Sequence, residues 1–324
     1  MAALLAGLIL AGAQTWSLPA ARPCDAAELA ELTAEATTPY RLTCRAVLTP
    51  GQSIVRPLLI EGAEASGARL DCAGGVVGRP GASVSTRTPS IAVWSRRIAA
   101  DRWSRPTDVR ISRCLIHGSV RVWGMGADGS YDDLRVSSRT ADHTAAAQAA
   151  APSHIALDEV VIRGTGSIPL YVGPGVTRLN LTRSTLEGRS VATALYLDAE
   201  SADNRIEGNL FRTRTGREMI AVDGSARNRI IGNRFELNGR PGVFLYRNCG
   251  ERGVIRHQTP SYNVITDNAF TGAARWRPRL VVENARQGRR AYCGADKGYP
   301  WGSSLDDRDG SSQNVVSYNS GKLA

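Results

Sequence analysis

The chain lacks the features that identify several common classes of protein. It contains no C-x-x-C pair, so neither a zinc site nor a thioredoxin-like redox centre is expected. A helix-turn-helix, a zinc-finger spacing and an RNA-recognition motif are also missing, which argues against a nucleic-acid partner. After the first residues, no segment is apolar enough to span a membrane.

Lysine is scarce, and arginine supplies almost all of the positive charge. The 40 Lys and Arg residues exceed the 30 Asp and Glu residues, which gives a formal net charge of +10. A basic balance favours an acidic partner. Because nucleic acid is the weaker choice, we expect an acidic polysaccharide. The alternative is an arginine excess that only keeps an exported protein soluble.

The chain begins with the apolar run MAALLAGLILAGA, which ends in an A-x-A cleavage pattern. The run is too short to cross a bilayer and is typical of a signal peptide over residues 1–13, although the usual basic residues before it are missing. Six cysteines agree with export, because disulfides form in oxidising compartments. We therefore expect a secreted or periplasmic protein. We also expect it to be a monomer.

An internal repeat determines the predicted fold. Four segments share an asparagine, a β-branched residue two positions later and a second asparagine five positions after the first. These segments are DNRIEGNLF (203–211), RNRIIGNRF (227–235), YNVITDNAF (262–270) and QNVVSYNSG (313–321). Short apolar runs with strand alternation lie upstream of them, and the first three are 25 residues apart. They are PLYVG (169–173), ALYLD (194–198), MIAVD (219–223) and VFLYRN (243–248).

Neither the 3.6-residue period of helical repeats nor the spacing of leucine-rich repeats is present. The pattern predicts an all-β, single-stranded, right-handed parallel β-helix of about ten coils. Weaker coils are expected at 106–123, 131–138, 153–164 and 176–188. In such a solenoid Asn209, Asn233 and Asn268 would form a ladder, with Phe211, Phe235 and Phe270 stacked beside it. A β-sandwich with chance similarity between its strands is the alternative.

The β-helix is expected over residues 49–324, after an N-terminal cap over residues 14–48. A solenoid end exposes core and unpaired backbone, so it needs a cap. The segment CDAAELAELTAEA (24–36) is predicted to form a capping helix with Asp25 as its N-cap. We expect a disulfide between Cys24 and Cys44, which flank this helix, and a second one between Cys72 and Cys114.

The Asn-x-Ile-x-x-Asn-x-Phe coils at 203–211, 227–235 and 262–270 resemble the repeats of the pectate-lyase-like superfamily. The resemblance concerns architecture, and it covers roughly residues 50–320. That superfamily contains polysaccharide lyases, glycoside hydrolases, epimerases, phage tailspikes and non-enzymatic adhesins, so the fold alone does not give a function. The Gly-His-Gly and Arg-Ile-Lys of the polygalacturonase pattern are both missing, which argues against that branch.

The 25-residue step predicts an outward-facing column that contains Asp198 and Asp223, with Asn248 next to them. Coils about 4.8 Å apart would bring the two carboxylates together, and one pKa would rise unless a cation lies between them. Three interpretations are open: a Ca²⁺ site of Asp198, Asp223 and Glu200, the carboxylate pair of a retaining glycosidase, or residues that cap turns. Calcium is the only cofactor considered.

The same step places Tyr171, Tyr196, Ala221 and Tyr246 in a second outward column. A 24-residue step would put Arg247 in place of Asn248, and in either register Arg247 is expected beside Glu283. Long insertions at 248–261 and 284–311 follow the strands of these columns. Each insertion contains one cysteine, so a disulfide between Cys249 and Cys293 is predicted to hold both loops over the aspartates.

The two loops and the columns provide the candidate site. Guanidinium groups suit the carboxylates of sugar acids, aromatic rings suit pyranose faces, and His or carboxylate side chains can transfer protons. The candidate catalytic residues are Asp198, Asp223, Arg247, Arg256, His257 and Glu251. The candidate substrate-binding residues are Tyr196, Tyr246, Asn248, Glu283, Arg290 and Trp301.

These residues lead to three hypotheses for the function. The first is an exported polysaccharide lyase that acts on an anionic, uronate-containing glycan, in which a base takes the proton next to the neutralised carboxylate. The second is a glycoside hydrolase that uses the Asp198 and Asp223 pair. The third, from another class, is a non-catalytic β-helix that binds glycan or serves a structural role at the cell envelope.

Overall fold

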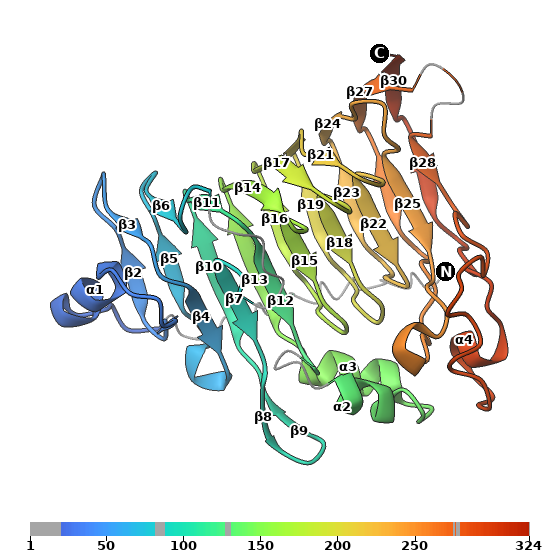
Figure 1. Ribbon diagram of the computed structural model, residues 1–324, viewed down its shortest axis with the longest axis horizontal. Helices are drawn as coiled ribbons and strands as arrows, with labels where there is room; N and C mark the ends of the chain where they lie inside the picture. Colours follow the sequence, from blue (N-terminus) through green and yellow to red (C-terminus); the bar gives the residue numbers. More distant parts are fainter. Residues whose placement is uncertain (1–20, 82–87, 127–130, 275, 277–278, 324) are drawn as a thin grey trace, which may run out of the picture.

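The protein is a right-handed parallel β-helix built from three long parallel sheets (Figure 1). The computed structural model describes residues 21–81, 88–126, 131–274, 276 and 279–323, so the predicted signal peptide lies outside the described residues. Two sheets have nine strands and the third has ten, in agreement with the predicted number of coils. Within the described ranges, none of the helices has the length and apolar character required to cross a membrane.

Each coil contributes one strand to each sheet, and we name the sheets in the order in which a coil visits them. The first sheet consists of β1 (Tyr40–Arg41), β4 (Leu58–Glu61), β7 (Ile91–Trp94), β12 (Val120–Trp123), β15 (Leu170–Val172), β18 (Leu195–Leu197), β22 (Ile220–Asp223), β25 (Val243–Tyr246) and β28 (Val281–Val282). The second sheet consists of β2 (Arg45–Val47), β5 (Arg69–Asp71), β10 (Thr107–Ser112), β13 (Ser153–Asp158), β16 (Asn180–Thr182), β19 (Arg205–Glu207), β23 (Arg229–Ile231), β26 (Val264–Thr266) and β29 (Val315–Ser317).

The third sheet consists of β3 (Ser53–Ile54), β6 (Val76–Val77), β11 (Leu115–His117), β14 (Val161–Gly166), β17 (Thr185–Ser190), β20 (Leu210–Phe211), β24 (Arg234–Glu236), β27 (Ala269–Ala273) and β30 (Ser320–Leu323), with β21 (Arg214–Thr215) paired to β17. An antiparallel hairpin of β8 (Arg96–Ala99) and β9 (Arg102–Ser104) stands apart from these sheets. The helical elements are α1 (Ala26–Thr33), α2 (Tyr131–Ser137), α3 (His143–Ala150), α4 (Gly302–Leu305) and the short 3-10 turns η1 (Ala63–Ala65) and η2 (Glu251–Gly253).

One continuous apolar core fills the interior of the solenoid. Alternate residues of each strand point inward, and equivalent residues of successive coils stack on one another, as Leu181, Ile206 and Ile230 do. The predicted asparagine ladder is present: the Asn209 side-chain amide donates to Oδ1 of Asn233 over 3.0 Å, and Asn233 donates to Asn268 over the same distance. The phenylalanine stack is also confirmed, with ring centroids 4.8 and 4.5 Å apart.

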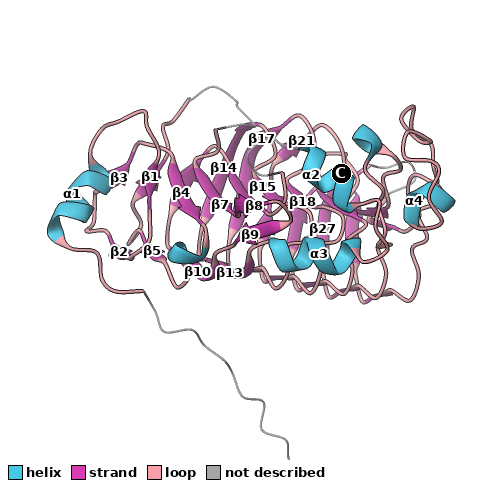
Figure 2. Ribbon diagram, turned by 90° about the horizontal axis from the view of Figure 1, so that it is seen from below, coloured by secondary structure: helices cyan, strands magenta, loops and turns pink. Residues whose placement is uncertain are grey.

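The N-terminal cap forms as the sequence predicts. Asp25 is the N-cap of α1, and its side chain and that of Glu28 make a capping box. Leu32 of α1 is fully buried and joins the solenoid core, while β1 and β2 already lie within the segment 14–48 assigned to the cap. Disulfides join Cys24 to Cys44 and Cys72 to Cys114. Figure 2 shows α1 at one end of the elongated molecule.

Two predictions about the coils are wrong. The segment 131–138 was expected to be a strand, but Tyr131–Ser137 forms α2. Asp132 and Asp133 suit the first turn of a helix, Arg135 pairs with Asp132 over 2.8 Å, and Leu134 is the buried residue of the helix. The second wrong prediction is that a constant 25-residue step places Tyr246 in one column with Tyr171, Tyr196 and Ala221.

The 25-residue step holds between β15, β18 and β22, where Tyr171, Tyr196 and Ala221 are in register. Ala221 then pairs with Phe244, and Tyr246 pairs with Asp223. The two turns of that coil are each one residue shorter than in the coil before it. A shift of two residues leaves the facing of every side chain unchanged, so Tyr246 still points to the outer face.

Candidate active site

Four large insertions leave the carboxyl ends of first-sheet strands. The β8–β9 hairpin follows β7, the α2–α3 segment follows β12, and residues 248–261 and 284–311 follow β25 and β28. Figure 1 shows α2, α3 and α4 along this one edge of the sheet. The sequence predicts two of these four insertions. Outward side chains of the first sheet form a separate buried cluster of Tyr196, Ala221, Phe244 and Tyr246.

A pocket of about 230 Å³ lies between the last three of these insertions and the ends of β12, β15 and β18; the β8–β9 hairpin contributes no lining residue. We call it the first-sheet pocket. It is lined by Trp123, Tyr131, Leu134, Tyr171, Pro174, Tyr196, Asp198, Arg217, Asn248, Glu251, Arg252, Val254, Arg256, Arg286 and Tyr292. Five of the predicted site residues therefore meet there, namely Tyr196, Asp198, Asn248, Glu251 and Arg256.

Asp198 lies in the pocket wall, and its carboxylate accepts three hydrogen bonds from the described residues. Its Oδ1 accepts from Nη1 of Arg256 over 2.8 Å and from the backbone N–H of Ala199 over 2.8 Å. Its Oδ2 accepts a hydrogen bond from the Tyr171 hydroxyl. The Asp198 and Arg256 side chains are only 6% and 8% exposed. Burial alone would lower the pKa of Arg256, but the charges of Asp198 and Asp223 outweigh it and raise that pKa well above its ordinary value.

Asp223 lies beneath the pocket and does not line it. It is fully buried, and it accepts hydrogen bonds from the Tyr196 hydroxyl over 2.5 Å and from the Asn248 backbone N–H over 2.7 Å. Burial raises the pKa of Asp223 to about 6; the charge of Arg256 opposes this rise and the nearby Asp198 adds to it. The rise expected from two neighbouring aspartates is therefore present, although desolvation is its larger cause.

Aromatic rings form one wall of the pocket. Trp123, Tyr171 and Tyr196 stack along the helix axis, with centroids 5.2 Å apart for the first pair and 5.5 Å for the second. Tyr131 of α2 packs edge-on against Trp123. The stack exists because each of these side chains occupies an outward position of successive coils in the first sheet. The ring planes are inclined by 44° between Trp123 and Tyr171 and by 24° between Tyr171 and Tyr196, so the wall offers aromatic faces of the kind against which a sugar ring can lie.

Among the described residues, four arginines and two carboxylates line the pocket. Arg217 pairs with Glu218, and Arg256 pairs with Asp198. The guanidinium of Arg286 lies 3.5 Å from the ring centroid of Tyr246 and donates to Oδ1 of Asn248. The guanidinium of Arg252 lies 3.9 Å from the Tyr131 ring centroid, and within the described residues it contacts no carboxylate.

Glu251 is the more accessible of the two carboxylates that line the pocket. Its side chain is 41% exposed, and its contact with a charged group is a distance of 3.9 Å to Nη2 of Arg256. Unlike the Asp198 carboxylate, the Glu251 carboxylate accepts no hydrogen bond from the described residues. It is therefore accessible to a bound molecule or to water.

The remaining predicted site residues lie elsewhere. Arg247 donates to the backbone carbonyls of Asp306 and Arg308, so the expected contact with Glu283 is wrong; Glu283 instead accepts from Ser311 and Asn314. The His257 ring bonds to the Ser138 carbonyl and lies 6.0 Å from the Trp301 ring. Arg290 is exposed outside the pocket lining. Tyr246 is fully buried behind it and donates to Glu218.

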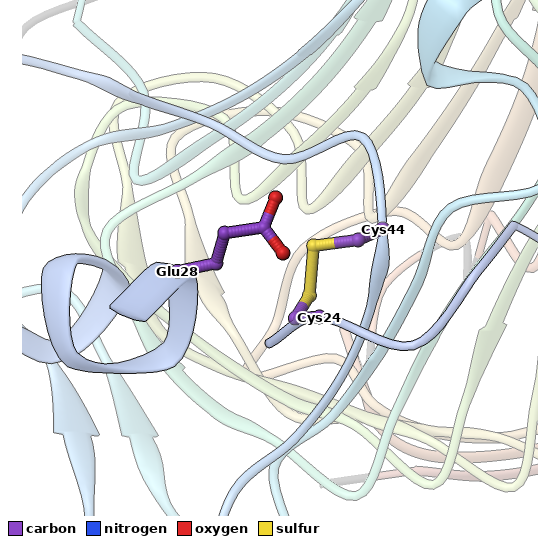
Figure 3. Close-up of side chains that lie close together, drawn as sticks. All are labelled: Cys24, Glu28 and Cys44. Carbon is purple, nitrogen blue, oxygen red and sulfur yellow. A yellow bond between two sulfur atoms is a disulfide. The ribbon is translucent and has the colours of Figure 1, made fainter. Parts of the chain in front are cut away.

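The residues predicted to bind Ca²⁺ do not form a set of convergent ligands. The cationic group beside Asp198 is the Arg256 guanidinium, and Glu200 accepts from Thr144 and from the backbone amide of His257. Across the described ranges, His, Cys, Asp and Glu donor atoms converge in two groups, each of which includes a disulfide. Figure 3 shows the first, in which Glu28 lies beside the Cys24–Cys44 bond. A disulfide sulfur is not the thiolate that binds a metal.

The disulfide between Cys249 and Cys293 joins the two insertion loops, as the spacing of these cysteines predicts. One loop supplies Glu251, Arg252 and Arg256 to the pocket, and the other supplies Arg286 and Tyr292. Asn248 connects them at the base, because its Oδ1 accepts from both Arg286 and Tyr292. The bond thus fixes the pocket wall.

Several pocket residues are missing from the candidates read from the sequence. Tyr131 and Leu134 belong to α2, which the sequence reading assigned to a strand, and Trp123 and Tyr171 belong to the outward columns without having been selected. Arg217, Arg252 and Arg286 carry no spacing signal that separates them from the many other arginines of the chain. The column of tyrosines is the sequence feature from which the aromatic wall could have been predicted.

No protein-family model and no curated protein matches this chain. Among solved structures it is similar to the full-length tailspike protein 2 from Escherichia coli O157:H7 bacteriophage CAB120, with 12% sequence identity and a TM-score of 0.37 over 89% of this chain and 38% of that chain. It is also similar to the enzymatically active domain of bacteriophage CBA120 tailspike protein 2, with 11% identity and a TM-score of 0.29 over 89% of this chain and 42% of that one. The chain spans about two fifths of the length of these structures. The likeness to the pectate-lyase-like superfamily stays a resemblance in architecture.

Proposed function

We propose that the protein is an exported polysaccharide lyase that binds an anionic, uronate-containing glycan in the first-sheet pocket. The observation that carries the proposal is the excess of arginine over carboxylate around an aromatic wall. Arg252 lies at the pocket without a carboxylate contact in the described residues, so its guanidinium group is available to a carboxylate ligand. Arg286 is already held by the Tyr246 ring, by Asn248 and by Glu218, whose Oε1 lies 3.8 Å from its Nη2, so it adds positive charge to the pocket wall. The stack of Trp123 and Tyr171 provides the surface for the sugar ring.

In a lyase, binding and chemistry are linked through the uronate carboxylate. Guanidinium groups that neutralise it make the proton on the adjacent carbon more acidic. Glu251 takes that proton, the electron pair of the C–H bond forms the C4=C5 double bond, and the C4–O4 bond breaks. Glu251 then returns the proton to the departing O4 oxygen, so no proton is consumed. One accessible carboxylate is sufficient for this sequence.

Arg256 is a binding and positioning group in this proposal and not a base. Its ion pair with the buried Asp198 raises its pKa well above the ordinary value, so it keeps its proton. Asp198 in turn orients Tyr171 through the phenolic hydrogen bond. Arg247 and His257 lie outside the pocket lining, and we assign them no chemical step.

A glycoside hydrolase is the second candidate, with Asp198 and Glu251 in place of the Asp198 and Asp223 pair. The observation that favours it is that Arg256 and Tyr171 together hold Asp198 as a hydrogen-bonded carboxylate at the pocket surface. Such a carboxylate suits a nucleophile, and the accessible Glu251 suits an acid or base. Asp223 is enclosed, so it cannot reach a glycosidic bond without a rearrangement.

The test is product analysis on a panel of polyuronates and neutral glycans. A lyase produces unsaturated uronates, detected by the ultraviolet absorbance of the new double bond, whereas a hydrolase produces reducing ends without that absorbance. Glu251→Gln should remove either activity and leave folding intact. The matched control is Glu236→Gln on the exposed rim of the third sheet, which should retain activity. Binding of a polyuronate without any product from the wild type would identify a non-catalytic binder and overturn the proposal.

Export and a monomeric state belong to the same proposal. Three disulfides suit an oxidising compartment, which supports a secreted or periplasmic location. The monomeric state is the second part of this proposal. Fractionation of the producing cells and light scattering of the purified protein test these two points. A cytoplasmic fraction or a stable oligomer would contradict them.

A further inference from the structure

A second concave surface lies on the third sheet, away from the first-sheet pocket. It is a groove of about 690 Å³ and shares no lining residue with the pocket. We call it the third-sheet groove. Its charged lining consists of Arg163, Arg189, Arg212, Arg214 and Glu187, with His117 at one side. Four arginines therefore face one carboxylate.

The parallel register arranges these side chains in two rows along the helix axis. In the first row, Glu187 lies between Arg163 and Arg212 and accepts from both, over 2.7 and 2.6 Å. In the second row, Arg189 pairs in register with Arg214. Both of these arginines are exposed, and in the described part of the chain neither contacts a carboxylate. Like charges on adjacent strands repel each other, so a bound anion would stabilise this row.

The space between the two rows is kept open by glycine. Gly164 of β14 and Gly188 of β17 are register partners. Gly188 has a φ of +80°, and a Cβ atom there would come 2.3 Å from the Gly164 carbonyl oxygen. A larger residue is therefore excluded from this part of the groove floor. The floor is bare backbone, and the charged groups stand on both sides of it.

We propose that the third-sheet groove is a second binding site for an acidic polysaccharide, with Arg189 and Arg214 as its anchoring residues. Adjacent coils repeat about every 4.8 Å, so the guanidinium groups form a periodic row that suits a linear polymer with repeating carboxylate or sulfate groups. Single-stranded nucleic acid is disfavoured, because among the described residues no Phe, Tyr or Trp side chain lines the groove to stack with bases. The site holds the polymer and has no part in cleavage, so it does not depend on the chemistry in the pocket.

The experiment compares polymer binding by two double variants. Polygalacturonate and heparin serve as carboxylated and sulfated probes, and affinity is measured across a salt series with the full chain. Arg189→Gln/Arg214→Gln should weaken binding of the polymers by about tenfold or more and reduce the salt dependence. The matched control is Arg205→Gln/Arg229→Gln, which removes the same charge from another pair of exposed register partners, on the second sheet. This control should bind the polymers as the wild type does.

Three other results of this binding experiment would contradict the inference. Equal losses in both double variants would mean a nonspecific charge effect, and no loss in either would mean that the groove is not a binding site. A single-stranded oligonucleotide that binds more tightly than polygalacturonate and depends on Arg189 and Arg214 would overturn the choice of polysaccharide.

Failure of the proposed lyase function is distinguishable from failure of this inference. If no glycan is cleaved but polymer binding still depends on Arg189 and Arg214, the groove stands without the lyase. If cleavage occurs and the double variant degrades and binds polymers as the wild type does, the lyase stands without the groove. A uronate disaccharide, which only the first-sheet pocket would hold, should be bound equally by wild type and double variant.

Discussion

At the scale of single residues, the pocket uses one arrangement twice. A tyrosine hydroxyl donates to an aspartate carboxylate 27 residues later, first from Tyr171 to Asp198 and then from Tyr196 to Asp223. Successive coils place the two pairs beside each other, but their surroundings differ. Asp198 faces the pocket and is neutralised by Arg256, whereas Asp223 is sealed beneath Asn248. Equivalent positions in the repeat thus acquire different electrostatic properties.

The Asp198–Arg256 pair should contribute to stability because removal of one partner leaves a buried charge. We expect Asp198→Ala to lower the free energy of unfolding by about 3–5 kcal/mol. The control is Asp203→Ala, since Asp203 and Arg227 form an ion pair with side chains 39% and 47% exposed. Its loss should be at most about 1 kcal/mol. Equilibrium unfolding in urea measures both, and equal losses would show that the pair in the pocket is effectively solvated.

Asp223 should make stability depend on pH. Burial raises its pKa from 3.8 to about 6 in the folded protein, so the folded state binds more protons in this interval. Its contribution to stability is fully present below about pH 4 and is lost as the pH rises through about 6, for a total on the order of 3 kcal/mol. Asp223→Asn removes this titration. The readout is the difference between the unfolding free energies of wild type and variant at several pH values.

The wild type must be compared with the variant because other carboxylates change the stability with pH in the opposite direction. The Arg113 guanidinium lowers the pKa of Asp71, for example, and such groups stabilise the protein as the pH rises. These contributions are common to wild type and variant and cancel. A difference that stays constant from about pH 4 to about pH 7.5 would falsify the buried titration of Asp223.

At the scale of elements, the pocket is formed by loops and not by strands alone. The strands of the first sheet provide the aromatic wall and Asp198, but most of the arginines come from η2 and the two insertions. Loops of this length need a constraint to hold side chains in place. The Cys249–Cys293 disulfide and the Asn248 hydrogen bonds supply it.

Two disulfides of nearly equal span allow stability and pocket structure to be separated. Cys249–Cys293 closes 44 residues and Cys72–Cys114 closes 42, so loss of either should destabilise the protein by about 4 kcal/mol. Only Cys249→Ser/Cys293→Ser should increase amide hydrogen exchange in residues 248–261 and 284–311. In Cys72→Ser/Cys114→Ser these loops should keep the protection of the wild type. Equal exchange of the loops in both variants would mean that the disulfide does not fix the pocket wall.

The sequence predicts those elements whose periodicity arises from the fold itself. Asn209, Asn233 and Asn268 recur because each amide needs the next one as a partner, and the cysteines of the loops follow from the position of the insertions. The helix at Tyr131–Ser137 was missed because its residues alternate well enough to imitate a strand. The pocket arginines were missed for another reason. Their roles depend on loop conformation, which has no periodic signal.

At the scale of the whole molecule, the solenoid separates its functions along and around one axis. The cap occupies one end, the pocket lies at the carboxyl ends of first-sheet strands, and the groove lies on the third sheet. The net charge of +10 is therefore distributed unevenly over the molecule, because arginines outnumber carboxylates in the linings of the pocket and of the groove. Each coil contacts mainly its neighbours, so a local change should remain local.

The capping helix gives a direct test of this one-dimensional behaviour. Leu32 is fully buried against the core of the first coils, so Leu32→Asp places a charge there and should lower the local unfolding free energy by on the order of 3 kcal/mol or more. Hydrogen exchange should accelerate in β2, β3 and β5, while β18 and β22 beside the pocket keep their protection. Ala30→Asp, at an exposed position of the same helix, is the control and should change neither region. If Leu32→Asp opens β18 and β22 together with the first coils, the solenoid unfolds as a single cooperative unit and the separation of cap and pocket does not hold.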